Sequence, residues 1–438
     1  MSRFILAALA TLAATGAFAQ SSVQIVGTFD PSVAATKTTY ASGASVSQNL
    51  IRNNSQGTSQ ITFKGTEDLG GGLKASFLLE NDFDARYDAN GPEGVSTAGV
   101  RGVNMGAFGG EQFLALEGGF GKIQVGAANT PSLTTQASRQ PFSTKIGGGF
   151  NGVTGTGHVR SNNSIVLTSP TFSGFTVAAA YAFNQKAAPM PATGDVAIAN
   201  ANTGASSTNS TIGNNQTSIS DIGLFYANGP IAAGVSLWQT SAYDVLGSAT
   251  TTAYSAKAVN QTNMFASYDM GVAKLTVGYH TEKQDYHTSV NAAATTAAAN
   301  GAVMAIGSQT TARGINAEGW NLAAVVPLSA NLNLLANYGE LKDKLAERSA
   351  FPLNKKISAI GLKYALSKNT SLYARYVDET NENIAAAYTN STWAVAGTVA
   401  LPATLAKSGA GTNYLGGAGS SNTAAKVTTA LVGVQMNF

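Results

Sequence analysis

The chain of 438 residues contains no cysteine, so disulfide bonds and thiolate metal sites are excluded. Charged residues make up only 11% of it, whereas soluble domains average about 25%. Lys and Arg number 26 and Asp and Glu 23, which gives a formal net charge of +3. This near balance of charge predicts no nucleic-acid partner.

The chain also lacks a long apolar run. No stretch approaches the roughly 20 consecutive apolar residues that a membrane helix needs. Its start has the form of a secretory signal peptide: Arg3, an apolar run over 4–14, and the small-x-small cleavage site Ala17-Phe18-Ala19. We therefore expect residues 1–19 to be removed. Since no linker divides the remainder, we expect residues 20–438 to form a single exported domain.

What the sequence does contain is alternation. In the closing stretch TTALVGVQMNF, apolar side chains occupy every second position: Val432, Val434, Met436 and Phe438. A period of two indicates a strand with one apolar face and one polar or small face. The chain thus ends on a strand and on an aromatic residue.

Similar strands recur along the whole chain, joined by connections that switch between very short and very long. The first short turn is Gly70-Gly71-Gly72. We predict sixteen strands, with seven short turns and eight long connections. The long connections are expected at about 34–57, 85–109, 129–162, 184–217, 242–259, 284–312, 342–354 and 380–422.

This rhythm is typical of an all-β transmembrane barrel of the Gram-negative outer membrane, with short periplasmic turns and long extracellular loops. Backbone groups in hydrocarbon must be hydrogen-bonded, and a sheet achieves this only by closing on itself. We expect the last strand to seal the barrel by pairing with the first, with its apolar set facing lipid. The alternative is a secreted soluble β-protein, such as a solenoid or adhesin, which would carry more charge.

Several stretches resemble the general porins of β-proteobacterial outer membranes. They are FKGTEDLGGGLKASFLLENDF, FGKIQVGAANTP, RSNNSIVLTSPTFSGF, YALSKNTSLYARY and the terminal aromatic strand. The resemblance implies a homotrimer of sixteen-stranded, water-filled antiparallel barrels, with the third long loop folded into each lumen. It also implies that Phe438 acts as a signal for the outer-membrane assembly machinery.

The third long loop is the candidate for the pore constriction. It carries Arg139, Lys145, His158 and Arg160, and no Asp or Glu occurs anywhere in 118–194. Cations at the narrowest ring would give a mild preference for anions. The alternative is that these cations brace the loop against carboxylates of the barrel wall, such as Glu80 or Asp82.

The resemblance also implies arginines on the constriction wall at three positions. The chain has Gln60 and Ala127 at two of them and retains Arg160 at the third. We take Gln60, Lys64, Glu80 and Arg375 as further candidates for the lumen wall.

The second long connection carries a cluster of acidic residues. The stretch NDFDARYDANGPEG groups Asp82, Asp84, Asp88 and Glu93, but it departs from a Ca²⁺ loop, and solvated carboxylates are the plainer interpretation. In trimeric porins this second loop reaches a neighbouring subunit, so a subunit contact stays open. No metal or other cofactor is predicted.

An enzyme is not predicted. The chain has three histidines, His158, His280 and His287. His158 and Ser161 are three positions apart and point to opposite faces of a strand. His280 and Glu282 share a face, and a pair on the lumen wall accounts for them without catalysis.

The function predicted from the sequence is passive diffusion of small hydrophilic solutes and ions through a water-filled channel. A substrate-specific channel of the same architecture is one alternative. A barrel that serves mainly as an adhesin or receptor is the other. The expected partners are the solutes, outer-membrane lipid, the assembly machinery and two further copies of the chain.

Overall fold

The computed structural model describes most of the strands and short turns and part of the long connections. The described residues are 22–40, 43–83, 109–138, 140–148, 160–186, 216–245, 253–256, 258–284, 289–290, 315–344, 354–382 and 424–438. Residues 1–19, the expected signal peptide, lie outside them. Within these ranges no helix is long and apolar enough to cross a membrane.

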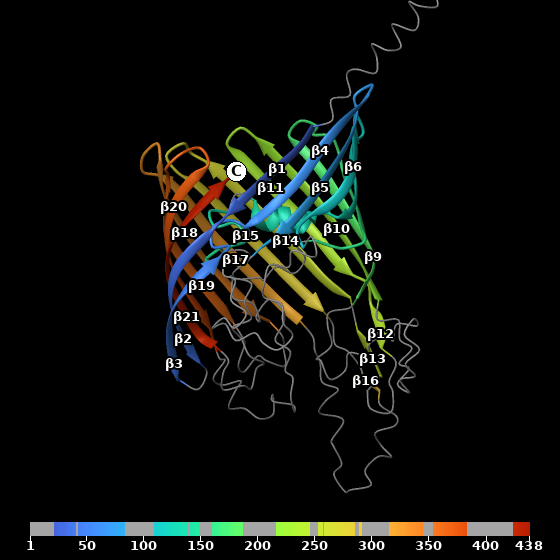
Figure 1. Cartoon of the computed structure of the whole chain (residues 1–438). Helices are drawn as coiled ribbons and strands as arrows, with labels where there is room; N and C mark the ends of the chain where they lie inside the picture. Colours follow the sequence, from blue (N-terminus) through green and yellow to red (C-terminus); the bar gives the residue numbers. More distant parts are fainter. Residues whose placement is uncertain are drawn as a thin grey trace, which may run out of the picture.

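Antiparallel strands form one closed sheet, and within the described residues one short helix, α2 (Pro131–Ala137), lies inside it (Figure 1). The first half of the chain contributes β1 (Ser22–Phe29), β2 (Pro31–Tyr40), β3 (Ser45–Asn53), β4 (Gln60–Gly70), β5 (Leu73–Asp82), β6 (Gln112–Gly118), β7 (Gly121–Ala127), β8 (Ser164–Thr168), β9 (Phe175–Lys186) and β10 (Gln216–Asn228). The second half contributes β11 (Ile231–Thr240), β14 (Val259–Asp269), β15 (Lys274–Gln284), β17 (Ile315–Pro327), β18 (Leu332–Asp343), β19 (Lys355–Ala365), β20 (Thr370–Asn381) and β21 (Ala424–Asn437).

These 18 segments make a sixteen-stranded barrel, as predicted. Asp30 alone separates β1 from β2, and β1 pairs with β4 while β2 pairs with β3. Each of the two pairs of segments, β1 with β2 and β3 with β4, is therefore one interrupted strand of the barrel.

The last strand closes the barrel. β21 pairs with β20 on one side and with β2 and β1 on the other. The final link is reciprocal: the Gly27 N–H donates to the Phe438 carbonyl at 2.8 Å, and the Phe438 N–H donates to the Gly27 carbonyl at 3.0 Å. This confirms the role predicted for the terminal strand.

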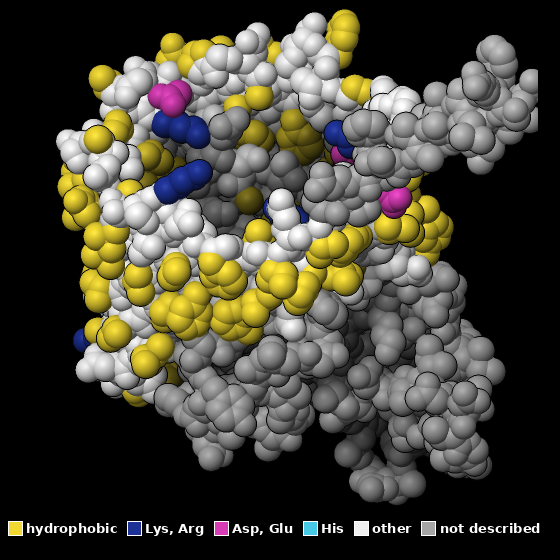
Figure 2. All heavy atoms as spheres, turned by 45° about the horizontal axis from the view of Figure 1, so that its top comes forward, with side chains coloured by type: hydrophobic (Ala, Val, Ile, Leu, Met, Phe, Trp, Pro, Cys, Tyr) yellow, Lys and Arg dark blue, Asp and Glu magenta, His cyan; other side chains and the backbone are white. Residues whose placement is uncertain are grey.

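Side chains alternate between the outside and the lumen along every strand. On β21, Val432 and Val434 are exposed on the outside, whereas Val427 and Leu431 are buried inside the barrel. Figure 2 shows hydrophobic side chains gathered on the near side of the outer surface and the hollow at the end that carries the short turns. Such an apolar outer surface is what a bilayer requires, because each exposed apolar side chain removes its surface from water when lipid covers it.

Three local predictions were wrong. The first long connection was expected over 34–57, but β2 runs to Tyr40 and β3 begins at Ser45. The alternation of β2 was masked because its inward set is small and polar, with Ser32, Thr36 and Thr38 buried.

The other two errors concern secondary structure inside expected loops. The loops expected at 242–259 and 284–312 contribute β12 (Tyr243–Val245), β13 (Ala253–Ala256) and β16 (Ser289–Val290), which form a separate small sheet beyond the barrel (Figure 1). Helix α2 lies in a segment that was expected to be loop.

Candidate functional site

The third long loop starts with helix α2, whose first turn is fixed by local chemistry and by the barrel wall. The Thr130 hydroxyl accepts from the Leu133 N–H at 3.1 Å, and Pro131 occupies the first turn, where its missing N–H costs nothing. The Asp221 carboxylate of β10 accepts from the Ser132 N–H at 2.7 Å and from its hydroxyl at 2.9 Å. The carboxylate thus lies at the positive end of the helix and holds it against the wall.

Beyond this anchor the loop crosses the inside of the barrel along successive strands. The Gln136 amide donates to Asn263 of β14 at 3.1 Å, and Gln140 accepts from Asn321 of β17 at 2.8 Å. The Asn337 amide of β18 then donates to the Gly147 carbonyl at 3.1 Å. These contacts place the described part of this loop against the inner face of β14, β17 and β18.

The tip of the loop contacts Arg375 of β20. The guanidinium lies 4.1 Å from the ring centroid of Phe142 and donates to the Ile146 carbonyl. It also donates to the Ser55 carbonyl at 2.8 Å and to the Gln56 side chain at 2.5 Å. Arg375, a candidate for the lumen wall, faces the inside of the barrel but is only 4% exposed. It therefore ties the loop to the wall and does not line the open passage.

Gly147 is needed at this close contact. Its φ is +78°, and a Cβ there would lie 2.7 Å from the Ala359 Cβ. Only glycine adopts this conformation without strain and lets the loop approach the wall so closely.

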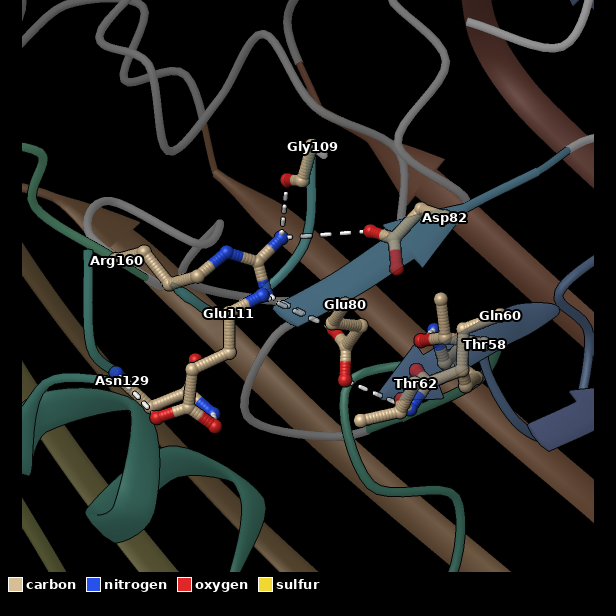
Figure 3. A network of polar contacts seen from close by, with 10 residues as sticks. Thr58, Gln60, Thr62, Glu80, Asp82, Gly109, Glu111, Asn129 and Arg160 are labelled. Atoms are coloured by element: carbon tan, nitrogen blue, oxygen red, sulfur yellow. Dashed lines mark hydrogen bonds and ion pairs between the residues drawn. The ribbon is translucent and has the colours of Figure 1, made fainter. Parts of the chain in front are cut away.

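On the other side of the loop, Arg160 faces carboxylates of β5 (Figure 3). Its guanidinium lies 3.8 Å from Glu80 and 3.4 Å from Asp82, and it donates to the Gly109 carbonyl at 3.2 Å. The Arg160 side chain is 24% exposed, so water still reaches the cluster. These are the ion pairs that the bracing alternative expects for Arg160.

Neighbouring groups hold the carboxylates in place (Figure 3). The Gln60 amide donates to Glu80 at 2.7 Å, so these two candidates for the lumen wall are in contact with each other. Glu111 accepts from the Asn129 backbone N–H at 2.9 Å and from its side-chain amide at 3.0 Å. Glu111 thereby fixes the point where the third loop leaves the wall.

Lys145 reaches the same region from the loop. Its ammonium donates to the Thr58 hydroxyl at 2.6 Å. Burial lowers the pKa of Lys145, and the carboxylates of Asp82 and Asp30 oppose that shift. In the described part of the site, the Lys145 ammonium is therefore hydrogen-bonded to a neutral group and forms no direct ion pair with a carboxylate.

Of the three remaining candidates for the pore lining, one lies within the described residues and two do not. Lys64 shares the lumen face of β4 with Gln60 and is exposed there. Arg139 and His158 lie outside the described residues, and the structure does not test their roles.

Sequence reasoning missed two acidic residues that fix chain segments inside the barrel: Asp221 holds the third loop, and Asp30 holds the segment before β4. The Asp30 carboxylate accepts from the N–H groups of Gln56 and Gly57 at 2.6 and 2.8 Å and from the Tyr373 hydroxyl at 2.5 Å. An acid on the small-residue face of a strand was the available signal for both.

His280 and Glu282 share the lumen face of β15, as expected. The His280 Nδ1 lies 2.6 Å from the Asn263 side-chain oxygen, and its Nε2 lies 3.8 Å from Glu282. No group of three or more metal-ligating side chains occurs within the described ranges. Of the acidic stretch weighed as a Ca²⁺ loop, Asp84, Asp88 and Glu93 lie outside those ranges, and Asp82 is paired with Arg160.

Comparisons with known proteins agree with this architecture. A family model described as Gram-negative porin matches residues 6–384. Outer membrane porin protein 32 of Delftia acidovorans is 33% identical over 281 residues, which cover 62% of this chain and 67% of that protein.

Two solved structures share the fold. The anion-selective porin from Comamonas acidovorans has a TM-score of 0.63 at 22% identity and covers 96% of this chain and 100% of its own. The trimer form of OmpT from Vibrio cholerae has a TM-score of 0.55 at 12% identity and covers 95% of this chain and 99% of its own.

Proposed function

The chain belongs to the Gram-negative porin family, and we propose that it is a general diffusion pore whose ion preference is weak and is set where the third loop meets β4 and β5. Its place is the outer membrane, and its activity is passive diffusion through the barrel. A sixteen-stranded barrel leaves a lumen too wide for side chains to fill, so a water-filled passage remains beside the loop. Small hydrophilic solutes and ions are the expected cargo.

The observation that carries the proposal is the near balance of charge at the constriction. Arg160 is matched by Glu80 and Asp82, whereas Lys145 is hydrogen-bonded to a neutral hydroxyl. We assign the mild anion preference to Lys145, with Lys64 as a further cation that is exposed on the lumen wall. The similar porin from Comamonas acidovorans is anion-selective by name, which supports the sign.

The test is the reversal potential of single channels in a KCl gradient. Wild type should conduct and should favour chloride several-fold at low salt, because a unit charge about 4 Å from a cation in water interacts with it by roughly 1 kcal/mol. Lys145→Gln should lose much of that preference. Burial lowers the pKa of Lys145, so its ammonium should lose its proton at a lower pH than that of an exposed lysine. As the pH is raised past that point, wild type and Lys145→Gln should come to have the same reversal potential.

A cation-selective wild type, or an unchanged potential in Lys145→Gln, would contradict the assignment. The two alternative functions give other outcomes. A substrate-specific channel would show conductance that its solute blocks at low concentration. An adhesin or receptor barrel would be plugged and would carry no current.

The same proposal includes the assembly of the protein. We infer cleavage after residue 19, a homotrimer, and recognition of the terminal strand by the assembly machinery; the trimer form of the similar Vibrio cholerae protein supports the second point. His280 and Glu282 are inferred to shape the lumen wall without a catalytic role.

Deleting Phe438 should reduce the amount of folded protein in the outer membrane by more than it lowers the stability of barrels that do form. The deletion removes two closing hydrogen bonds, each contributing about 1 kcal/mol, together with an exposed aromatic ring at the lipid interface. Surface protein and heat-modifiable monomer are measured side by side. Normal surface levels would argue against a role for Phe438 as an assembly signal.

A further inference from the structure

The barrel wall is interrupted between its first two strands. β2 pairs with β3 as far as Asn53, and β1 pairs with β4 from Gln60 onward. The six residues between these points, 54–59, stand opposite only two, Phe29 and Asp30. Extra residues in one strand of a pair bend that strand out of the sheet, and such bulges are frequent next to functional sites. We call residues 54–59 the wall segment.

The wall segment turns into the lumen and meets the third loop there. The Arg375 guanidinium donates to the Ser55 carbonyl at 2.8 Å and to the Gln56 side chain at 2.5 Å. The Lys145 ammonium, which belongs to the loop, donates to the Thr58 hydroxyl at 2.6 Å. Figure 3 shows Thr58 next to the polar side chains of β4 and β5 at the constriction. The wall segment and the loop tip are therefore joined to each other directly and through Arg375.

The wall segment is anchored on Asp30, which is fully buried. One carboxylate oxygen accepts from the N–H groups of Gln56 and Gly57 at 2.6 and 2.8 Å, and the other accepts from the Tyr373 hydroxyl at 2.5 Å. The Asp30 N–H donates to the Ser59 hydroxyl at 3.0 Å. Hydrogen bonds to a charged acceptor are roughly twice as strong as neutral ones. The carboxylate thus fixes the backbone in the middle of the wall segment.

The anchor is tied to a second part of the barrel by Tyr373 of β20. Its ring lies over Gly433 of β21, where an added Cβ would be 2.3 Å from the Tyr373 Cζ. The ring can therefore cross β21 and reach Asp30, which lies between β1 and β2. Arg375, two residues further along β20, reaches the wall segment itself. The position of the segment is thus set from both sides of the closing strand.

From this arrangement we propose that the wall segment is a second side of the constriction and that Asp30 is its positioning residue. By fixing Gln56 and Gly57, the Asp30 carboxylate places the Thr58 hydroxyl, which holds the Lys145 ammonium at the passage. Asp30 itself is buried and does not touch the solute. The inference rests on the proposed function, in which Lys145 gives the channel its preference for anions.

A positioning role and a plain charge effect of Asp30 have opposite signs. Removing a negative charge near the passage should by itself raise the preference for chloride. Releasing the wall segment should lower it, because Lys145 loses the hydroxyl that holds it. Asp30→Asn and Asp30→Ala remove the same charge, but the asparagine side chain keeps an oxygen that accepts from N–H groups. The difference between these two variants therefore measures positioning.

The first measurement is the reversal potential of single channels in a KCl gradient. Asp30→Asn should favour chloride at least as strongly as wild type. Asp30→Ala should lose most of the several-fold preference and approach Lys145→Gln. Thr58→Val, which removes the hydroxyl but keeps the bonds of Asp30, should lose it as well. The control is Asp269→Ala: this carboxylate accepts from the Gly271 N–H at 2.9 Å in the turn after β14, and its loss should leave the preference unchanged.

The second measurement does not depend on ion selectivity. The chain contains no cysteine, so a single one can report on the wall segment. Ser55 is 1% exposed, and Ser55→Cys should react slowly with a water-soluble maleimide, both alone and together with Asp30→Asn. Together with Asp30→Ala it should react about tenfold faster, because the loss of the anchor lets the segment open. If Asp30→Ala does not fold, Asp30→Ser takes its place, since its hydroxyl lies one bond short of the carboxylate oxygens.

Two results would overturn the inference and leave the proposed function standing. One is a loss of chloride preference in Lys145→Gln that neither Asp30→Ala nor Thr58→Val reproduces. The other is an equal labelling rate of Ser55→Cys beside Asp30→Asn and beside Asp30→Ala. An unchanged potential in Lys145→Gln contradicts the proposed function itself, whereas the labelling rates decide independently whether Asp30 anchors the wall segment.

Discussion

Neutralising Glu80 and Asp82 together should make the pore strongly anion-selective, and neutralising Arg160 should make it cation-selective. In wild type the two carboxylates lie 3.8 and 3.4 Å from the Arg160 guanidinium and offset its charge. Glu80→Gln/Asp82→Asn leaves that cation facing the passage without a counter-charge. Arg160→Gln leaves two carboxylates instead.

The expected size follows from Coulomb's law. Two unit charges about 4 Å apart interact by roughly 1 kcal/mol in water and about 4 kcal/mol at an effective dielectric constant of 20. A hydrated constriction lies between these limits, and a factor of ten corresponds to about 1.4 kcal/mol. Because a hydrated constriction lies near the aqueous limit, we expect each variant to move the permeability ratio by roughly five- to tenfold, in opposite directions. In about 1 M salt, where the Debye length is about 3 Å, both shifts should shrink.

The matched control is Glu117→Gln. Glu117 is also on the lumen face and pairs with Lys122 at 3.3 Å, but it lies next to the short turn after β6 and away from the third loop. Glu117→Gln and Glu80→Gln each remove one negative charge, but Glu117→Gln should shift the reversal potential much less. Equal shifts would place the selectivity filter somewhere other than this cluster.

Replacing Arg375 should release the third loop and destabilise the barrel. Arg375→Ala removes the contact with Phe142 and the hydrogen bonds to the Ser55 and Ile146 carbonyls and to Gln56. A hydrogen bond that involves a charged group contributes roughly 1.5–3 kcal/mol, and Arg375 makes three of them. The temperature at which the folded form is lost should fall, and single-channel recordings should show larger current noise as the tip of the loop moves.

Arg375→Lys separates charge from geometry. It keeps the positive charge but lacks the planar fork that reaches three acceptors and packs on the ring. It should show current noise like that of Arg375→Ala and ion selectivity like that of wild type. Quiet channels in both variants would mean that the other contacts of the loop, such as Asn337 with Gly147, hold it without Arg375.

The barrel could be predicted from the sequence because a bilayer enforces a period of two on every strand and a closed sheet on the whole chain. Most of strand β2 was not predicted, because its buried residues, such as Ser32 and Thr36, are small and polar. They face a lumen, where the usual link between burial and apolar character does not hold. Helix α2 was missed although Thr130 and Pro131 form a helix start.

The constriction was predicted less well, for a reason of distance in sequence. The third loop itself does carry cations and no acid, but its counter-charges come from Asp30, Glu80 and Asp82, which precede it by many residues. Only the register of β4 with β5, and the return of Arg160 to that wall, bring these groups together. A count of the charges in one segment cannot detect ion pairs between that segment and distant parts of the chain.

Closure has a consequence for the order of folding. Thr28 and Asn437, which are hydrogen-bonded at the seam, are 409 residues apart, and contacts between such distant residues form slowly. Until β21 arrives, two strand edges stay open to pairing with other chains. Arg375, one strand before the seam, is also the residue that holds the tip of the third loop. The narrow passage is therefore completed only as the barrel closes, and a barrel stalled before that step would be both prone to aggregate and unselectively wide.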